Sequence, residues 1–159
     1  MVQSGLDMLE ESLRKKIEVM TRIEEENARQ KEILSDPGDI DDKAFDETVD
    51  KKGELIDQLL LLDDGFQTLF DSVKKEVGDN KEKYAEQIRR MQMLIHDITD
   101  KSASIQAEEH RNKKLAEMYF SSAREKLSTG KRSASAAFNY YQNMSKSKDI
   151  QPQFLDQKN

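Results

Sequence analysis

Hydrophobic residues recur every three or four positions along most of the chain, and this spacing is typical of one face of an α-helix. A first helix is predicted from about Ser4 to Leu34. Its apolar stripe consists of Leu6, Leu9, Leu13, Ile17, Met20 and Ile23. Ser4 is expected to cap this helix, because the acidic residues Asp7 and Glu10 follow it and carboxylates suit the positive end of the helix dipole.

The stripe of the first helix becomes polar in its second half. Asn27 and Gln30 occupy positions where the repeat calls for apolar residues. Two interpretations are open. A polar layer inside a helical bundle fixes the register of its helices. Alternatively, this end of the helix is simply solvated.

A turn and a second helix are predicted next. Pro37 disfavours helix at the residue before it, and Gly38 permits a turn, so a break is expected near residues 35–42. The second helix then runs from about Asp42 to Val77, capped by Asp41 or Asp42. Its apolar residues are Phe45, Val49, Leu55, Ile56, Leu59, Leu62, Phe66, Leu69, Phe70, Val73 and Val77. This face is wider than the seam of a two-stranded coiled coil and indicates a bundle.

Within the second helix, the core of the bundle is expected at Leu59, Leu62, Phe66 and Leu69. Gly53 and Gly65 also lie in this helix, where glycine is unfavourable relative to alanine. A close approach between helices is one reason for such glycines.

A second break is predicted at residues 77–80, where Gly78 suits the end of a helix and Asp79 with Glu82 resembles a capping box. The third helix is predicted from about Asn80 to Leu127. Its apolar stripe comprises Tyr84, Ile88, Met91, Leu94, Ile95, Ile98, Ile105, Leu115, Ala116, Tyr119, Ala123 and Leu127. The stripe becomes polar around residues 108–112. The segment 105–127 either extends past the other helices or pairs with the polar end of the first.

The last 32 residues, 128–159, differ from the helical body at 1–127. They are rich in Ser, Asn, Gln and Lys and contain five basic and two acidic residues, so we expect a flexible tail. This tail nevertheless holds a set of large apolar and aromatic side chains, some of them spaced to form a short docking helix. They are the candidate partner-binding residues Phe138, Tyr140, Tyr141, Met144, Ile150, Phe154 and Leu155. Packing on the chain's own helices, or on a second copy, is the alternative.

Composition supports the helical interpretation. The chain has 159 residues, 36% of them charged and 35% hydrophobic, with only six Gly and two Pro. These proportions exclude a strand-rich sandwich and a doubly wound α/β enzyme. We predict an all-α fold: a long antiparallel helical bundle or coiled coil of three main helices with a polar, aromatic-containing C-terminal tail. No apolar run approaches membrane-spanning length, so no stable membrane insertion is expected.

The sequence offers little catalytic chemistry. There is no Cys, and the two histidines, His96 and His110, are too far apart on one helix to share a metal. His96 is expected to be partly buried, and the many carboxylates are expected to be solvated on helix surfaces. No nucleotide-binding or hydrolase motif occurs. We therefore expect neither enzyme activity nor a cofactor or metal, and the net charge of −6 argues against nucleic-acid binding.

Three segments carry a resemblance to a known family. They are the leucines of residues 6–13, EEENARQKEIL at 24–34, and AFDETVDKKGELIDQLLLLDDGFQTLFDSV at 44–73, where Lys52 precedes leucine-rich turns. In these features the chain resembles the FlgN family of flagellar type III export chaperones, over about residues 4–127. The resemblance implies a cytoplasmic, all-helical chaperone that works without nucleotide. It would bind hook–filament junction subunits through its C-terminal part and deliver them to the export gate.

Other functions remain open at this stage. One is a non-enzymatic coiled-coil structural or adaptor protein that dimerises or bridges partners. Another is an acidic regulatory protein that sequesters a basic partner. The N-terminus shows no signal peptide, which together with the absence of Cys predicts a cytoplasmic location. Homo-oligomerisation is left open.

Overall fold

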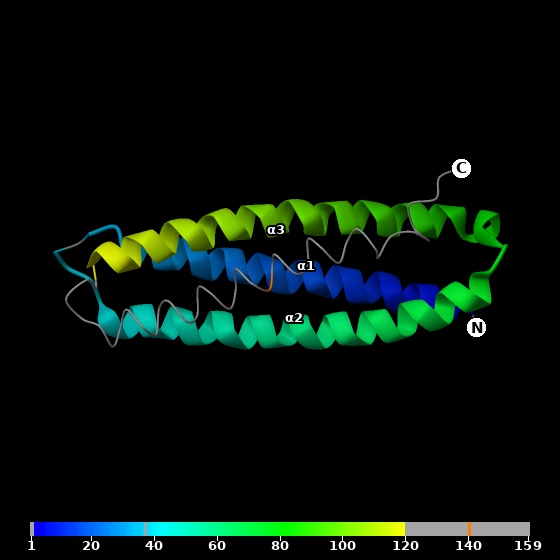
Figure 1. Ribbon diagram of the computed structural model, residues 1–159, viewed down its shortest axis with the longest axis horizontal. Helices are drawn as coiled ribbons and strands as arrows, with labels where there is room; N and C mark the ends of the chain where they lie inside the picture. Colours follow the sequence, from blue (N-terminus) through cyan, green and yellow to red (C-terminus); the bar gives the residue numbers. More distant parts are fainter. Residues whose placement is uncertain (1, 37, 120–139, 141–159) are drawn as a thin grey trace.

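Three long helices form an antiparallel bundle. The computed structural model describes residues 2–36, 38–119 and 140, which contain α1 (Val2–Ile33), α2 (Asp42–Val77), a 3₁₀ turn η1 (Lys81–Tyr84) and α3 (Ala85–Tyr119). α1 and α3 run in one direction and α2 runs in the other (Figure 1). The predicted all-α bundle of three main helices is thus confirmed, and no strand occurs in the described ranges.

The first helix begins earlier than the sequence predicts. α1 starts at Val2, so Ser4 lies inside the first turn and the predicted cap at Ser4 is wrong. Tertiary contacts hold this turn in place of a cap. The amide of Gln3 donates to Gln87 of α3 at 2.7 Å. Gly5 packs so closely on α2 that a Cβ atom would lie 2.6 Å from Val73 Cγ2.

The loop between α1 and α2 is closed by aspartate side chains. Asp36 accepts a hydrogen bond from the backbone N–H of Gly38 at 3.2 Å. Asp41 is the N-cap of α2, and its carboxylate accepts from the N–H of Ala44 at 3.1 Å. The second contact satisfies a backbone donor that a helix start leaves unpaired. α2 then covers Asp42–Val77, as predicted.

The connection from α2 to α3 departs from the prediction. Gly78 has φ +50°, and its N–H donates to Lys74 O at 3.2 Å, which ends α2 as expected. Asn80, however, precedes the 3₁₀ turn η1 without a side-chain cap, so the predicted capping box of Asp79 and Glu82 does not form. A tighter first turn of this kind is common at helix starts. α3 therefore begins at Ala85, and the predicted continuation to residue 127 lies outside the described residues.

The main apolar core fills most of the bundle's length. Leu59 and Phe66 are buried in it, while Leu62 and Leu69 are partly buried and pack against it. Phe66 stacks on Phe70 with ring centroids 5.9 Å apart. The wide apolar face of α2 thus packs mainly against α1, which also packs against α3.

A second, smaller apolar cluster lies near the loop between α1 and α2. It consists of the buried residues Leu34, Phe45, Val49 and Ala116. Along each helix, polar residues separate this cluster from the main core. On α3, for example, Glu109 and Asn112 stand between Ile105 of the main core and Ala116 of the second cluster.

Gly53 and Gly65 lie within α2, where a close approach between helices was one expected reason for them. Close packing among the described residues does not explain Gly53 and Gly65, because a Cβ atom at either would meet none of their atoms within 4 Å. Among the described residues, no helix has both the length and the apolar character needed to cross a bilayer.

Candidate functional site

A layer of buried polar side chains crosses the bundle between the two apolar clusters. Each of its members is at most 3% exposed, and each of the three helices supplies two of them. The members are Asn27 and Gln30 of α1, Thr48 and Lys52 of α2, and Glu109 and Asn112 of α3. We call this set the polar layer. Burial of so many polar groups is unfavourable unless they bind one another.

Lys52 lies at the centre of the polar layer. Its Nζ donates to Asn27 Oδ1 at 3.0 Å and to Gln30 Oε1 at 2.9 Å. It also forms a hydrogen-bonded ion pair with Glu109 Oε1. These three acceptors match the three N–H donors of an ammonium group, and they come from two different helices.

The amides of α1 complete the polar layer. Asn112 Nδ2 donates to the backbone carbonyl of Asn27 at 2.9 Å and to Gln30 Oε1 at 3.1 Å. Gln30 Nε2 in turn donates to Thr48 Oγ1 at 3.0 Å. Asn27 Nδ2 reaches Glu108 Oε1 at the rim, at 3.0 Å. Each helix is therefore tied to both others by hydrogen bonds.

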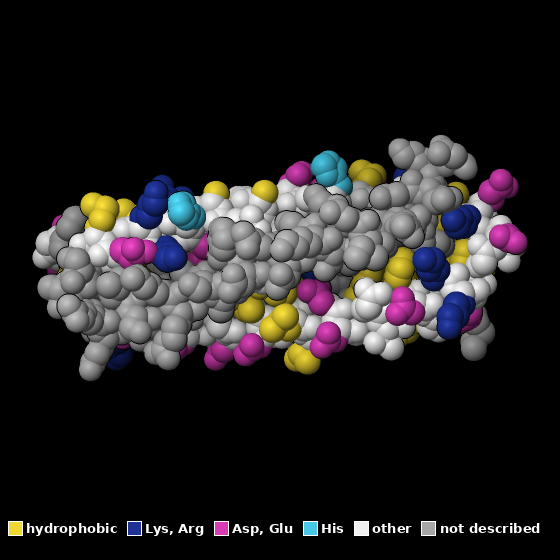
Figure 2. Space-filling view, in the orientation of Figure 1, with side chains coloured by type: hydrophobic (Ala, Val, Ile, Leu, Met, Phe, Trp, Pro, Cys, Tyr) yellow, Lys and Arg dark blue, Asp and Glu magenta, His cyan; other side chains and the backbone are white. Residues whose placement is uncertain are grey.

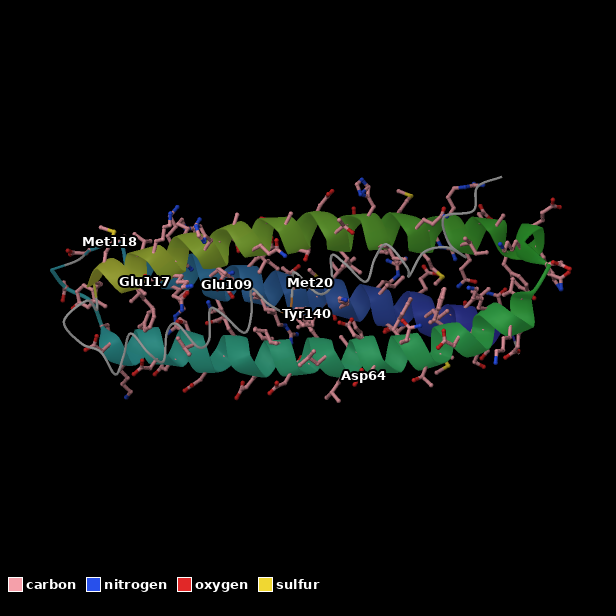
Figure 3. The ribbon with its side chains drawn as sticks, viewed as in Figure 1. Met20, Asp64, Glu109, Glu117, Met118 and Tyr140 are labelled. Atoms are coloured by element: carbon pink, nitrogen blue, oxygen red, sulfur yellow. The ribbon has the colours of Figure 1, made fainter. Side chains whose placement is uncertain are left out.

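Burial dominates the electrostatics of Glu109. Removal from water raises the pKa of this carboxyl, and the ammonium of Lys52 opposes the increase. Its second oxygen, Oε2, is buried with no hydrogen-bond partner among the described residues. Glu109 was expected at a solvated surface, and that expectation is wrong because the residue faces α1 and α2 (Figure 3).

The polar layer decides between the interpretations left open for the first helix. Asn27 and Gln30 are buried, so the solvated alternative is wrong and the bundle-layer alternative holds. The polar part of α3 pairs with this end of α1, since Asn112 bonds to both residues.

Lys52 and Thr48 are the members that the apolar pattern did not single out. Lys52 follows Val49 by three positions and precedes Ile56 by four. It therefore continues the stripe of α2, and that spacing is the signal that could have identified it.

A second polar cluster surrounds Glu10 near the start of α1. Arg90 donates to both carboxylate oxygens, at 3.2 and 3.1 Å, and Arg14 donates to Oε2 at 2.7 Å. Gln87 adds a bond at 3.0 Å. The hydrogen bonds from Arg90, assisted by those from Arg14 and Gln87, lower the pKa of Glu10 to about 2 against the effect of burial.

Tyr140 is the one candidate partner-binding residue that the structure describes. It is buried against the main apolar core, between α1 and α2 (Figure 3), so at this residue the alternative of packing on the chain's own helices holds. Its hydroxyl donates to Asp63 Oδ2 at 2.5 Å. Lys16 of α1 donates to the other oxygen of Asp63 at 2.5 Å, and its Nζ lies 6.0 Å from the Tyr140 ring centroid. We call Lys16 and Asp63 the tyrosine seat.

The other candidate residues lie outside the described ranges or on the surface of the bundle. Those that lie outside the described residues are Phe138, Tyr141, Met144, Ile150, Phe154 and Leu155. The side chain of His96 is 73% exposed, with Nδ1 4.0 Å from Asp100, so the expectation of partial burial is wrong. In the described ranges, no group of three or more His, Cys, Asp and Glu side chains is arranged to hold a metal ion.

The chain was compared with known protein families, curated proteins and solved structures. No protein-family model, curated protein or solved structure matches the chain. The polar layer and the tyrosine seat are therefore interpreted from their own geometry.

Proposed function

We propose that the protein is a cytoplasmic flagellar export chaperone of the FlgN type, which binds hook–filament junction subunits before type III secretion. The proposal starts from the resemblance at residues 4–127, whose leucine-rich segments form the apolar faces of α1 and α2. It requires neither nucleotide nor metal, and the bound subunit is then passed to the export gate.

The observation that carries the proposal is a site between α1 and α2 that holds an aromatic side chain, occupied here by the chain's own Tyr140. This residue comes from the C-terminal part of the chain, which the resemblance associates with substrate binding. Its ring packs on the main core while its hydroxyl bonds to Asp63. Aromatic side chains with a polar tip are effective anchors at interfaces, because they combine a large apolar area with one directional bond.

A chaperone must release its cargo, so its binding to the cargo must be reversible. A helical segment of a subunit can bind by placing apolar side chains in a groove between helices. Ordering that segment costs conformational entropy, which keeps the complex reversible. Under the proposal, Tyr140 leaves its site between α1 and α2 when cargo binds. It then acts with Phe138, Tyr141 and Met144, and with the cluster Ile150, Phe154 and Leu155, as the cargo-binding element.

The direct test is to mix the purified chain with a purified junction subunit and to separate the mixture by size-exclusion chromatography with light scattering. We expect a soluble complex of fixed stoichiometry. A junction subunit without its terminal helical segments is the control and should elute separately. Tyr140→Ala should weaken the complex, whereas Met118→Ala on the exposed surface of α3 should not.

The same experiment identifies the alternative function. A coiled-coil structural or adaptor protein would give no complex with the junction subunit. Its own mass would instead rise with concentration as copies associate. That result would replace the chaperone proposal.

A further inference from the structure

The outer face of α2 carries two adjacent leucines in solvent. Leu60 is 48% exposed and Leu61 is 73% exposed. Isolated apolar side chains on a surface need no explanation. These two are neighbours on one helix, whereas the other large exposed hydrophobic residues of the described part of the chain lie on α1 and α3. Those are Met8, Met93 and Met118.

Leu61 lies in the middle of a line of acidic residues. Positions spaced by four and three along a helix follow one side of it. Between residues 50 and 71, the exposed residues in this line are Asp50, Glu54, Asp57, Leu61, Asp64, Thr68 and Asp71, and the exposed Lys75 continues it one turn further on. From residue 50 to residue 71 the line thus contains five carboxylates and no basic residue. We call this line, together with Leu60 and Gly65 beside it, the α2 outer face.

The negative charge of the α2 outer face is not neutralised by ion pairs within the described chain. No ion pair involves Asp50, Glu54 or Asp57 there, although such pairs form elsewhere on the bundle surface, as between Lys101 and Glu24. Acidic and apolar side chains alternate along the edge of α2 in the space-filling view (Figure 2). Asp64 projects from this edge, away from the other helices (Figure 3).

Gly65 provides an independent observation at the same place. It follows Leu61 by one helical turn and is exposed. A Cβ atom at this position would meet nothing within 4 Å. Packing within the described part of the chain therefore gives no reason for a glycine that weakens the helix. A glycine on an exposed helix face does allow a second helix to approach the backbone closely.

We propose that the α2 outer face is a docking surface for a basic amphipathic helix of a partner protein. Apolar side chains of that helix would cover Leu60 and Leu61 beside Gly65, and its Lys and Arg residues would pair with Asp57 and Asp64. Electrostatic complementarity of this kind selects partners and accelerates association.

The charge of the α2 outer face argues against other occupants. Nucleic acid and anionic membranes would be repelled by the five carboxylates. A second copy docked face to face would bring two acidic lines together, which is also unfavourable. The inference concerns a different surface from the tyrosine seat and is independent of the proposed export role.

The test measures binding of a fluorescent synthetic helix with leucines at i, i+3 and i+7 flanked by lysines. Its counterpart has the same leucines flanked by glutamates. We expect the full-length protein to bind the basic peptide and not the acidic one, with affinity that falls as salt increases. Leu61→Gln should weaken binding at least tenfold. The matched control Met118→Gln replaces an equally exposed hydrophobic residue on α3 and should leave binding unchanged.

A variant that neutralises two carboxylates tests the electrostatic contribution to peptide binding. The double variant Asp57→Asn/Asp64→Asn should reduce both the affinity and its salt dependence, whereas Glu11→Gln/Glu25→Gln on the exposed side of α1 should not. Equal binding of the two peptides, no binding of either, or equal losses in test and control variants would overturn the proposal. A dimer that Leu61→Gln dissociates would assign the surface to a second copy instead. Since no junction subunit is present, a negative result leaves the export proposal to its own test.

Discussion

Lys52 of α2 and Glu109 of α3 form a fully buried ion pair, with side chains 3% and 1% exposed. Taking two charges out of water is costly, and their attraction offsets that cost only when the remaining donors are also satisfied. The amides of Asn27 and Gln30 meet this condition for Lys52. Such a pair contributes less to net stability than to the choice of one helix arrangement over others.

The ion pair gives the first prediction. Lys52→Met should destabilise the bundle by about 3–5 kcal/mol, because it leaves the Glu109 carboxylate buried without its counter-ion. Glu109→Gln should also be destabilising, since it leaves the Lys52 ammonium uncompensated. Urea denaturation monitored by circular dichroism measures both.

The double variant Lys52→Met/Glu109→Leu is the control for this prediction. It removes both charges and fills the space with apolar groups, so it should be far less destabilised than either single variant. If the single losses simply added in the double variant, the two residues would not act as a pair.

Glu10 gives a prediction about acid stability. Its pKa is about 2 in the folded chain, below its ordinary value of 4.5. Its contribution to stability is therefore present above pH 4.5 and is lost as the pH falls towards 2. We expect Glu10→Gln to lower the free energy of unfolding at neutral pH by about 1–2 kcal/mol, because both arginine partners are half exposed and solvent screens them. The difference between wild type and variant should vanish near pH 2. A difference that is constant with pH would contradict this assignment.

The glycines of the bundle give a third prediction: replacement by alanine should raise the stability at one position and lower it at two others. Gly65→Ala should stabilise the chain by up to about 1 kcal/mol, because the helix gains propensity and the Cβ atom meets no neighbour. Gly78→Ala should destabilise it, since Gly78 has φ +50°. Gly5→Ala should do so as well, because of the contact with Val73. Thermal unfolding of the three variants tests the order of their midpoints.

Tyr140 gives a fourth prediction. Tyr140→Phe keeps the ring but loses the hydrogen bond to Asp63, and should cost about 1 kcal/mol. Tyr140→Ala also loses packing on the main core and should cost about 3 kcal/mol. Removal of residues 128–159 should accordingly lower the melting temperature. An unchanged melt after truncation would show that Tyr140 contributes little to the body in solution.

Much of the fold could be predicted from periodicity, and the start of α1 departs from the prediction because of a contact between distant residues. The bounds of α2 followed from Asp41 and Gly78, which act through the backbone at the two ends of this helix. The start of α1 at Val2 could not be predicted in this way, because Gln3 is held by Gln87, a residue far away in sequence. Capping patterns describe an isolated helix end and carry no information about such a contact.

The polar layer could be predicted only in part. Asn27 and Gln30 interrupt an otherwise regular stripe, which singled them out. Lys52 did not stand out, since lysines on amphipathic helices usually extend their ammonium groups to water. Its burial depends on the ion pair with Glu109 of α3, and no spacing within α2 indicates that partner.

The separation of the two apolar clusters by charged and amide side chains has a consequence for how the bundle opens. Among the described residues, the small cluster around Leu34 and Phe45 is separate from the main core. Cooperativity between the two parts is therefore transmitted by hydrogen bonds rather than by continuous side-chain packing. Backbone amides at the Leu34 end should exchange with deuterium through a sub-global opening of lower free energy, while those around Leu59 and Met91 exchange only when the whole chain unfolds.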